Sequence, residues 1–211
     1  KAQYQLTLQA GSVLSNKRRS VAEEVARRVT KELTLLGLQG SIFTIYFQER
    51  PHESAEDIVS QGFEIVDFRF ASHSSVAPLP LGKGISGGEL SRLMLAVELT
   101  FLSDSSLGTL IFDEVDAGIG GEAGLIIGER LAKLAKKYQV IVVTHLAQVA
   151  VWGDAHFVIE KRAENSVVES SISRASSDAR VREVARMLAG QSDSDVALAH
   201  ARELLEHAQK S

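Results

Sequence analysis

Apolar residues in the first 40 positions recur at steps of three and four, as they do on one face of a helix. This stripe consists of Val21, Val25, Val29, Leu33 and Leu36. Gly37 follows it, and glycine commonly ends a helix. The residues before position 11 are ambiguous, because Tyr4, Leu6 and Leu8 alternate as in a strand whereas the glutamine and alanine content favours a helix. The pattern predicts a helix that ends near Gly37 and leaves its beginning open.

Two short runs rich in aromatic and β-branched residues follow, at 42–47 and 63–70, and both predict strands. A polar connection that contains Pro51 and Gly62 separates them. Residues 71–85 hold two prolines and two glycines and predict a loop.

The next helix is predicted to begin at Ser86. Glu89 stands three residues later, which is the spacing of a capping box, and apolar residues then recur at helical intervals up to Phe101. Gly87 and Gly88 leave the backbone N–H groups of the first turn uncovered, so a phosphate could approach the positive end of the helix dipole. A glycine-containing cap on an ordinary core helix predicts the same pattern.

Two apolar runs, 109–112 and 140–143, end in polar residues and predict buried parallel strands. Asp113 and Glu114 follow the first run, and His145 follows the second after one threonine. Ligands of open α/β sheets bind at this carboxyl edge. One carboxylate there can hold a magnesium ion, usually through water, while the other orients or deprotonates a water. The alternatives are a solvated acidic turn and a structural histidine.

In the rest of the chain, segments with the apolar spacing of a helix alternate with apolar runs typical of strands. Strand, helix and strand succeed one another in the middle, which predicts an α/β fold with a mostly parallel sheet flanked by helices. Glu164 and Asn165 predict a turn between two of the strands. The predicted elements are helix 122–136, strand 139–143, helix 147–151, strands 155–161 and 167–173, and helices 177–188 and 193–208.

Composition narrows the function classes. The 211 residues are 45% hydrophobic, enough for a sizeable core, and contain no cysteine, which excludes disulfides and thiolate metal sites and suits a reducing cytosol. No apolar run approaches the roughly 20 residues that span a bilayer. The net charge of −4 argues against a globally basic nucleic-acid binder. The one basic cluster is interpreted as a solvated helix face and consists of Lys17, Arg18, Arg19, Arg27 and Arg28.

The motifs, taken in order, resemble the ABC-type ATPases. Residues 85–89 resemble the signature motif of that superfamily, 110–114 its Walker B strand, 115–121 its D-loop, and His145 its switch histidine. Within that superfamily, the sequence is similar to the RecN family of SMC-like DNA-repair ATPases. The similar segments are 86–92, 112–121 and, in the tail, 182–190 and 200–205. This resemblance covers the chain from about residue 40 onward.

The resemblance implies a role for each site residue. Asp113 would hold Mg²⁺, Glu114 would act as the general base or orient the water, and His145 would contact the γ-phosphate of ATP. Asp116 would lie in the D-loop at an interface with a second head. The nucleotide of that opposite head would be capped by Ser86, Gly87, Gly88 and Glu89.

A P-loop is absent from the sequence. The only Gly–Lys pair is Gly82–Lys83, with Ala77 and Gly84 where the motif G-x-x-x-x-G-K-[ST] needs glycine and serine or threonine. The resemblance therefore implies the C-terminal lobe of an ABC-type ATPase head, residues 39–211, preceded by a helix from a returning coiled-coil arm, residues 1–38. The chain starts without methionine and looks like a piece of something longer.

The same resemblance implies the partners. They are the N-terminal P-loop lobe of the same protein, a second head in a homodimer, and DNA, with no membrane partner, in the cytoplasm at the nucleoid. Without the P-loop lobe, this chain is expected to be inactive as an ATPase.

Two other interpretations stay open. The nucleotide-binding domain of an ABC transporter shares the three motifs but carries both lobes on one continuous stretch. A non-catalytic clamp that binds ATP and DNA is disfavoured by Glu114, because the catalytic carboxylate is present.

Overall fold

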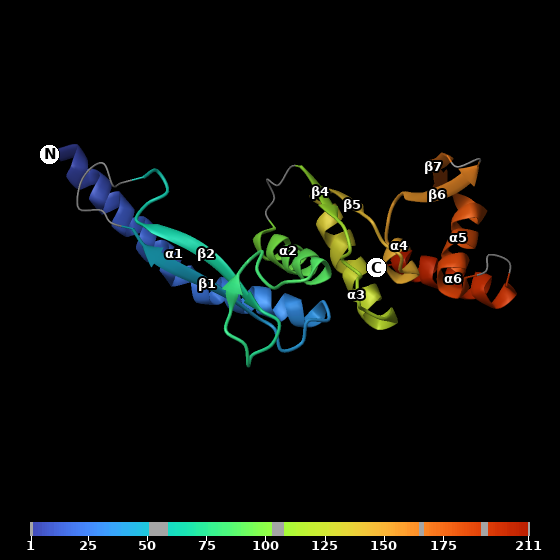
Figure 1. Cartoon of the computed structure of the whole chain (residues 1–211), viewed down its shortest axis with the longest axis horizontal. Helices are drawn as coiled ribbons and strands as arrows, with labels where there is room; N and C mark the ends of the chain where they lie inside the picture. Colours follow the sequence, from blue (N-terminus) through green and yellow to red (C-terminus); the bar gives the residue numbers. More distant parts are fainter. Residues whose placement is uncertain (1, 51–58, 103–107, 165–166, 191–193, 211) are drawn as a thin grey trace. The chain divides into compact units, whose positions relative to one another are not determined.

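The computed structural model describes residues 2–50, 59–102, 108–164, 167–190 and 194–210. The chain divides into two compact units, Lys1–Thr100 and Phe101–Ser211 (Figure 1). The predicted boundary between an arm and a head lobe near residue 38 stays a prediction. Within the described residues, every helix is too short or too polar to cross a membrane.

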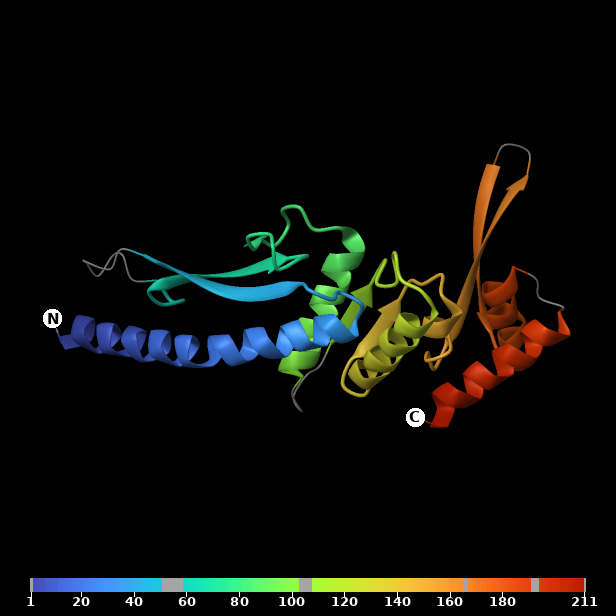
Figure 2. The same cartoon turned by 90° about the horizontal axis from the view of Figure 1, so that it is seen from below.

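The first unit is one long helix with a small antiparallel sheet along it. The strands β1 and β2 pair in a continuous register from Ile42 with Ala71 to Glu49 with Glu64, and α1 lies beside β1 (Figure 2). The elements of this unit are α1 (Ala2–Leu35), β1 (Ile42–Glu49), β2 (Glu64–Ala71), β3 (Leu79–Pro80) and α2 (Gly87–Phe101).

The ambiguous beginning of the chain is helical. Gly11 explains how the sheet reaches this part of α1, since a Cβ atom placed on it would lie 2.3 Å from Cζ of the Phe63 ring. A residue without a side chain therefore leaves room for the aromatic ring on the helix. The predicted loop 71–85 is a loop except for Ala71, which ends β2, and the two residues of β3, which pair with β2.

The predicted stripe of α1 is corrected at one position. Val21 is exposed, whereas Ala22 is buried together with Val29 and Leu33. At 3.6 residues per turn, a residue 11 positions before Leu33 lies about 20° from it around the helix, and a residue 12 positions before it lies about 120° away. Counting in steps of four residues from Val21 therefore predicts the wrong residue for the buried face at this end of the stripe.

The second unit holds the parallel strands. The strands β4 and β5 pair in parallel, with Phe112 opposite Val142, and α3 connects them. Its elements are β4 (Thr109–Phe112), α3 (Gly121–Ala135), β5 (Gln139–Val142), α4 (Ala147–Ala150), β6 (His156–Glu164), β7 (Val167–Ala175), α5 (Ser177–Ala189) and α6 (Asp195–Lys210).

The α/β class is confirmed, and so are the helices and strands predicted from residue 109 onward, with ends that differ by at most three residues. The parallel content is smaller than predicted. Among the described strands, only β4 and β5 pair in parallel, while β1–β2–β3 and β6–β7 pair antiparallel. Parallel pairing needs a crossover connection such as α3, whereas only two residues separate β6 from β7. The predicted turn at 164–165 lies partly outside the described residues.

One hydrophobic core cluster of the second unit is built from helices α4, α5 and α6. Trp152, the only tryptophan of the chain, packs against this core and meets the His207 ring edge-on with centroids 6.1 Å apart. The indole ring of Trp152 also lies over Gly128, where an added Cβ would come within 2.1 Å of it. The buried members of this core are Ala147, Val151, Val184, Ala185, Ala197, Ala201 and Leu205.

Arg180 of α5 ties this core to the end of α4. Its guanidinium donates hydrogen bonds to the carbonyl oxygens of Val151 (3.0 Å) and Gly153 (2.6 Å). Burial lowers the pKa of Arg180. Burial also lowers the pKa of His156 below 6.5, the nearby charge of Arg180 lowers it further, and Glu183 opposes both effects. His156 is therefore held in its neutral form more strongly than an exposed histidine.

Candidate functional site

The predicted capping box is present at the start of α2. The backbone N–H and the hydroxyl of Ser86 both donate to Oε2 of Glu89, at 3.0 and 2.8 Å, and the backbone N–H of Glu89 donates to the hydroxyl of Ser86 at 3.3 Å. The helix therefore begins within one residue of its predicted start. The Glu89 carboxylate is already committed to this cap.

The first turn of α2 leaves donors open. The backbone N–H of Leu90 donates to the carbonyl of Ser86 at 2.9 Å, which closes the first helical turn. Within the described residues, the backbone N–H groups of Gly87 and Gly88 have no such partner, as is usual at a helix beginning. Ser86 and Gly87 are exposed to solvent. This arrangement is suited to an anion.

The end of β4 is a tight turn with two exposed carboxylates. Asp113 and Glu114 follow the strand directly, and the backbone N–H of Ala117 donates to the carbonyl of Glu114 at 3.0 Å. Glu114 has a φ of 57°, in the left-handed region that glycine adopts more easily. That conformation costs an L residue about 1–2 kcal/mol. Such strain at a non-glycine residue often marks a functional position.

The parallel register brings the two predicted strand ends to one edge. Phe112 lies opposite Val142, and the backbone N–H of Val143 donates to the carbonyl of Phe112 at 2.9 Å. Asp113 and Glu114 therefore leave the sheet beside the segment that carries His145. Ser86, Gly87, Gly88 and Glu89 belong to the first unit, and this carboxylate edge belongs to the second.

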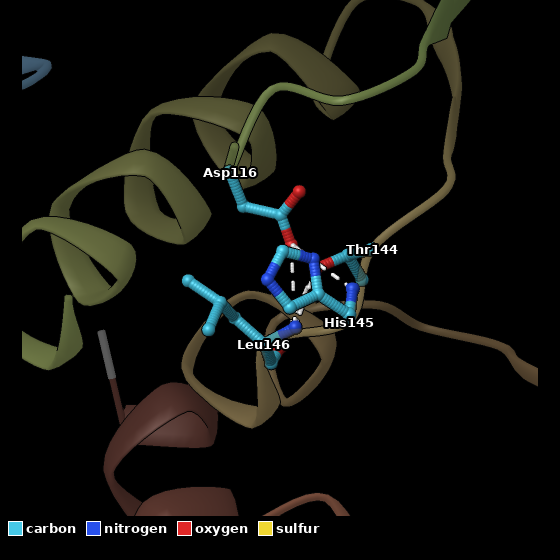
Figure 3. Close-up of polar contacts among 4 residues, drawn as sticks. All are labelled: Asp116, Thr144, His145 and Leu146. Atoms are coloured by element: carbon cyan, nitrogen blue, oxygen red, sulfur yellow. Dashed lines mark hydrogen bonds and ion pairs between the residues drawn. The ribbon is translucent and has the colours of Figure 1, made fainter. Parts of the chain in front are cut away.

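Asp116 holds the segment that carries His145 (Figure 3). Its Oδ2 atom accepts hydrogen bonds from the hydroxyl of Thr144 and from the backbone N–H groups of His145 (3.0 Å) and Leu146 (3.2 Å). The same oxygen lies 3.2 Å from Nδ1 of His145. Asp116 is 1% exposed, whereas the His145 side chain is 70% exposed.

The role of Thr144 was not predicted. The sequence placed it at the sheet edge, and only the structure shows its hydroxyl on a carboxylate 28 residues away. Asp116 was assigned to an interface with a second head through the family resemblance. Within its own chain its carboxylate contacts residues 144–146, and the assignment to an interface with a second head stays a prediction.

The basic cluster of α1 is largely used inside the first unit. Arg18 and Arg19 lie 3.7 and 3.4 Å from the carboxylate of Glu64, which is buried. Arg19 also lies over the Phe47 ring, 5.0 Å from its centroid. The interpretation as a solvated face is therefore too simple for these two arginines, which fasten α1 to the sheet.

Comparison with known proteins gives one consistent result. The "DNA repair protein RecN" of Mycobacterium leprae is 43% identical over 96% of this chain, and that of Streptomyces coelicolor is 44% identical over 92%. RecN of Haemophilus influenzae is 34% identical over 92%. The chain belongs to the RecN family. It spans 37%, 35% and 34% of the length of these three RecN relatives.

The match to RecN reaches further than the sequence motifs indicated. The expected resemblance began near residue 40, but relatives match up to 96% of the chain, so the similarity extends into α1. RecN membership disfavours the transporter domain as an alternative. No protein-family model matches the chain.

Two solved structures are also similar in backbone. An Smc head domain with a coiled coil and joint from Pyrococcus yayanosii has a TM-score of 0.47 at 16% identity, over 89% of this chain and 29% of that one. A structure from a study of ATP-driven dimerization and DNA-stimulated activation of SMC ATPases has a TM-score of 0.42 at 14% identity, over 93% and 98%. The RecN assignment rests on the sequence relatives.

Proposed function

We propose that this chain is the C-terminal lobe of the ATP-hydrolysing head of a RecN-type DNA repair protein acting at the nucleoid. The observation that carries the proposal is the parallel register of β4 and β5, which delivers Asp113 and Glu114 to the same sheet edge as His145. An edge with two carboxylates and a histidine can bind a metal-bound phosphate and activate water.

Magnesium would arrive together with the nucleotide. Within the described residues, no group of three or more carboxylate or histidine side chains could hold a metal ion by itself. This fits Mg²⁺, which commonly uses one or two carboxylates, waters and substrate phosphates in place of a complete protein cage. The exposed carboxylate of Asp113 is the proposed protein ligand.

Glu114 and His145 would have different roles in the reaction. Glu114 would accept a proton from the attacking water or orient it, and His145 would contact the γ-phosphate. Ser86, Gly87, Gly88 and Glu89 would bind the nucleotide of a second head through the open first turn of α2. ATP would thereby hold two heads together, and this pairing would be coupled to repair of DNA breaks.

An uncovered apolar face supports completion by a further lobe. Ile111 is 69% exposed, and its neighbour across the sheet, Ile141, and Val143 are exposed on the same face. Strands of parallel sheets are normally covered on both faces, and two strands alone are marginal. The proposed cover is the N-terminal P-loop lobe of the same protein, and the chain is therefore expected to show no ATPase activity alone.

The central test is Glu114→Gln in a head completed by a P-loop lobe. The variant keeps the side-chain volume and Asp113 but removes the proton acceptor, a role worth about 10²- to 10⁴-fold in rate. ATP binding should persist while hydrolysis falls by that order, and paired heads should accumulate in light scattering. Glu203→Gln removes the same charge from the exposed surface of α6 and should leave the rate unchanged. Near-parental hydrolysis by Glu114→Gln would leave the non-catalytic clamp as the better proposal.

Pairing of heads can be tested separately with Ser86→Arg. The added bulk lies at the open helix beginning and should block pairing while a single completed head still binds ATP. Ser74→Arg adds the same side chain to an exposed loop and should pair normally. Loss of ATP binding by the single Ser86→Arg head would place Ser86 in the site of its own head and contradict the proposal.

A further inference from the structure

A polar cluster of the second unit joins a buried carboxylate to an exposed ring. Three donors converge on Oδ2 of Asp116, two of them backbone N–H groups of residues 145 and 146, and the ring nitrogen Nδ1 of His145 lies 3.2 Å from the same atom (Figure 3). Because the carboxylate is 1% exposed and the ring 70%, one ring nitrogen faces the interior and the rest of the ring faces solvent.

We propose that Asp116 is a positioning residue for His145, which fixes the nitrogen that the ring presents to a ligand. An ionised carboxylate accepts hydrogen bonds only, so the ring nitrogen that faces it carries the proton. Nδ1 then points to Asp116 whether the ring is neutral or protonated. Nε2 accepts a hydrogen bond from a water when the ring is neutral, and it donates one to a phosphate oxygen when the ring is protonated.

The backbone contacts make this positioning rigid. The carboxylate binds the amide of His145 itself and that of the next residue, so it fixes the origin of the side chain as well as one ring nitrogen. Asp116 also stands two residues after Glu114, within the same turn. A single side chain therefore couples the position of the proposed catalytic carboxylate to that of the proposed phosphate-contacting histidine.

The tautomer of His145 in the 211-residue chain tests the pairing directly. Long-range ¹H–¹⁵N spectra at alkaline pH, where histidine rings are neutral, should show Nδ1 protonated and Nε2 unprotonated, with the His145 signal assigned by its loss in His145→Gln. Free imidazole side chains favour the opposite tautomer. An Nε2–H majority in the unmodified chain would overturn the proposal without any variant.

Asp116→Asn removes the negative charge of the carboxylate but keeps the shape of the side chain. The amide oxygen of asparagine can still accept from the backbone N–H groups, so the 144–146 segment should keep its amide shifts while the tautomer moves toward Nε2–H. Thr144→Val loosens the same cluster but keeps the carboxylate, and Asp178→Asn removes an equal charge from the exposed start of α5. Both should leave the tautomer unchanged. An unchanged tautomer in Asp116→Asn would overturn the assignment.

The consequence for catalysis rests on the proposed function. In a completed head, Asp116→Asn should lower kcat by about 10- to 100-fold, the order seen when the orienting partner of a metal-ligating histidine is lost, with KM for ATP little changed. A changed tautomer with unchanged kcat would overturn the positioning role. If the parental completed head does not hydrolyse ATP, the proposed function fails, while the spectra of the chain still decide the pairing of Asp116 with His145.

Discussion

Two regions of the chain carry the predicted nucleotide-binding residues, and they are constructed differently. The beginning of α2 is closed by contacts between Ser86 and Glu89, three residues apart. The carboxylate edge depends on Asp116 and a segment 28–30 residues further along the chain. The first region is specified by its own sequence, whereas the second forms only when β4 and β5 are paired.

The largest effect on folding is expected from Asp116→Ala. The substitution removes the acceptor of the His145 backbone N–H, whereas the N–H of Leu146 keeps the Thr144 hydroxyl at 3.1 Å and that hydroxyl keeps the carbonyl of Leu146 at 3.5 Å. An unsatisfied donor costs about 1–3 kcal/mol when water cannot reach it, and we expect a loss of this order in the free energy of unfolding. Urea unfolding followed by Trp152 fluorescence measures it, since this sole tryptophan lies in the second unit. A loss below about 1 kcal/mol would mean that water replaces the carboxylate.

A smaller and local effect is expected from Ser86→Ala. Loss of an N-cap side chain costs about 1 kcal/mol. Amide hydrogen exchange should accelerate at Glu89 and Leu90, in the first turn of α2, while the fluorescence transition of Trp152 stays in place. Ser74→Ala, in an exposed loop, is the control. Destabilisation that spreads through the second unit would contradict the local character of this region.

A still smaller effect on the free energy of unfolding is expected from substitutions of Glu114, because its backbone is left-handed. Glycine adopts the left-handed conformation without the cost of about 1–2 kcal/mol, but it loses about 0.5–1 kcal/mol through the flexibility of the unfolded chain. Glu114→Gly should therefore be more stable than Glu114→Ala by about 0.5–1 kcal/mol in urea unfolding. The same pair of substitutions at Glu203, within α6, should show the reverse order, because glycine weakens helices.

The smallest effect concerns pH. Folding lowers the pKa of His156 below 6.5, mainly through burial, so the unfolded chain binds this proton more readily than the folded one. The contribution of His156 to stability is fully present above pH 6.5 and is lost as the pH falls through that value toward the folded pKa. The urea midpoint reported by Trp152 should decline in this window, and His156→Gln should decline less. Equal pH dependence of the two proteins would exclude His156 as a cause.

The same contrast explains what the sequence could predict. Ser86 with Glu89, and the apolar runs before Asp113 and before His145, are local patterns, and the structure confirms the elements that they predict. The beginning of α1 was left open, because the alternation of Tyr4, Leu6 and Leu8 competed with a composition that favours a helix. The approach of Phe63 to Gly11, from 52 residues away, is not visible in such a local pattern.

Other features also lay beyond local patterns. The position of Ala22 in place of Val21 follows from helix geometry summed over three turns, and the short spacing between apolar residues concealed it. The hydrogen bond from the hydroxyl of Thr144 to Asp116 joins the segments that follow two strands, and the spacing of residues in the sequence does not predict it. The parallel content was overestimated, because the turn predicted at Glu164 and Asn165 leaves room only for an antiparallel pair, which β6 and β7 form.

The left-handed turn at position 114 has a genetic consequence. A single base change converts either glutamate codon into a glycine codon, and glycine is the residue that this backbone accommodates most easily. Folding therefore offers little protection against this route to losing the carboxylate. If Glu114 persists in a population of such genes, selection must act on what its side chain does, and a screen that scores only soluble expression will pass the glycine variant.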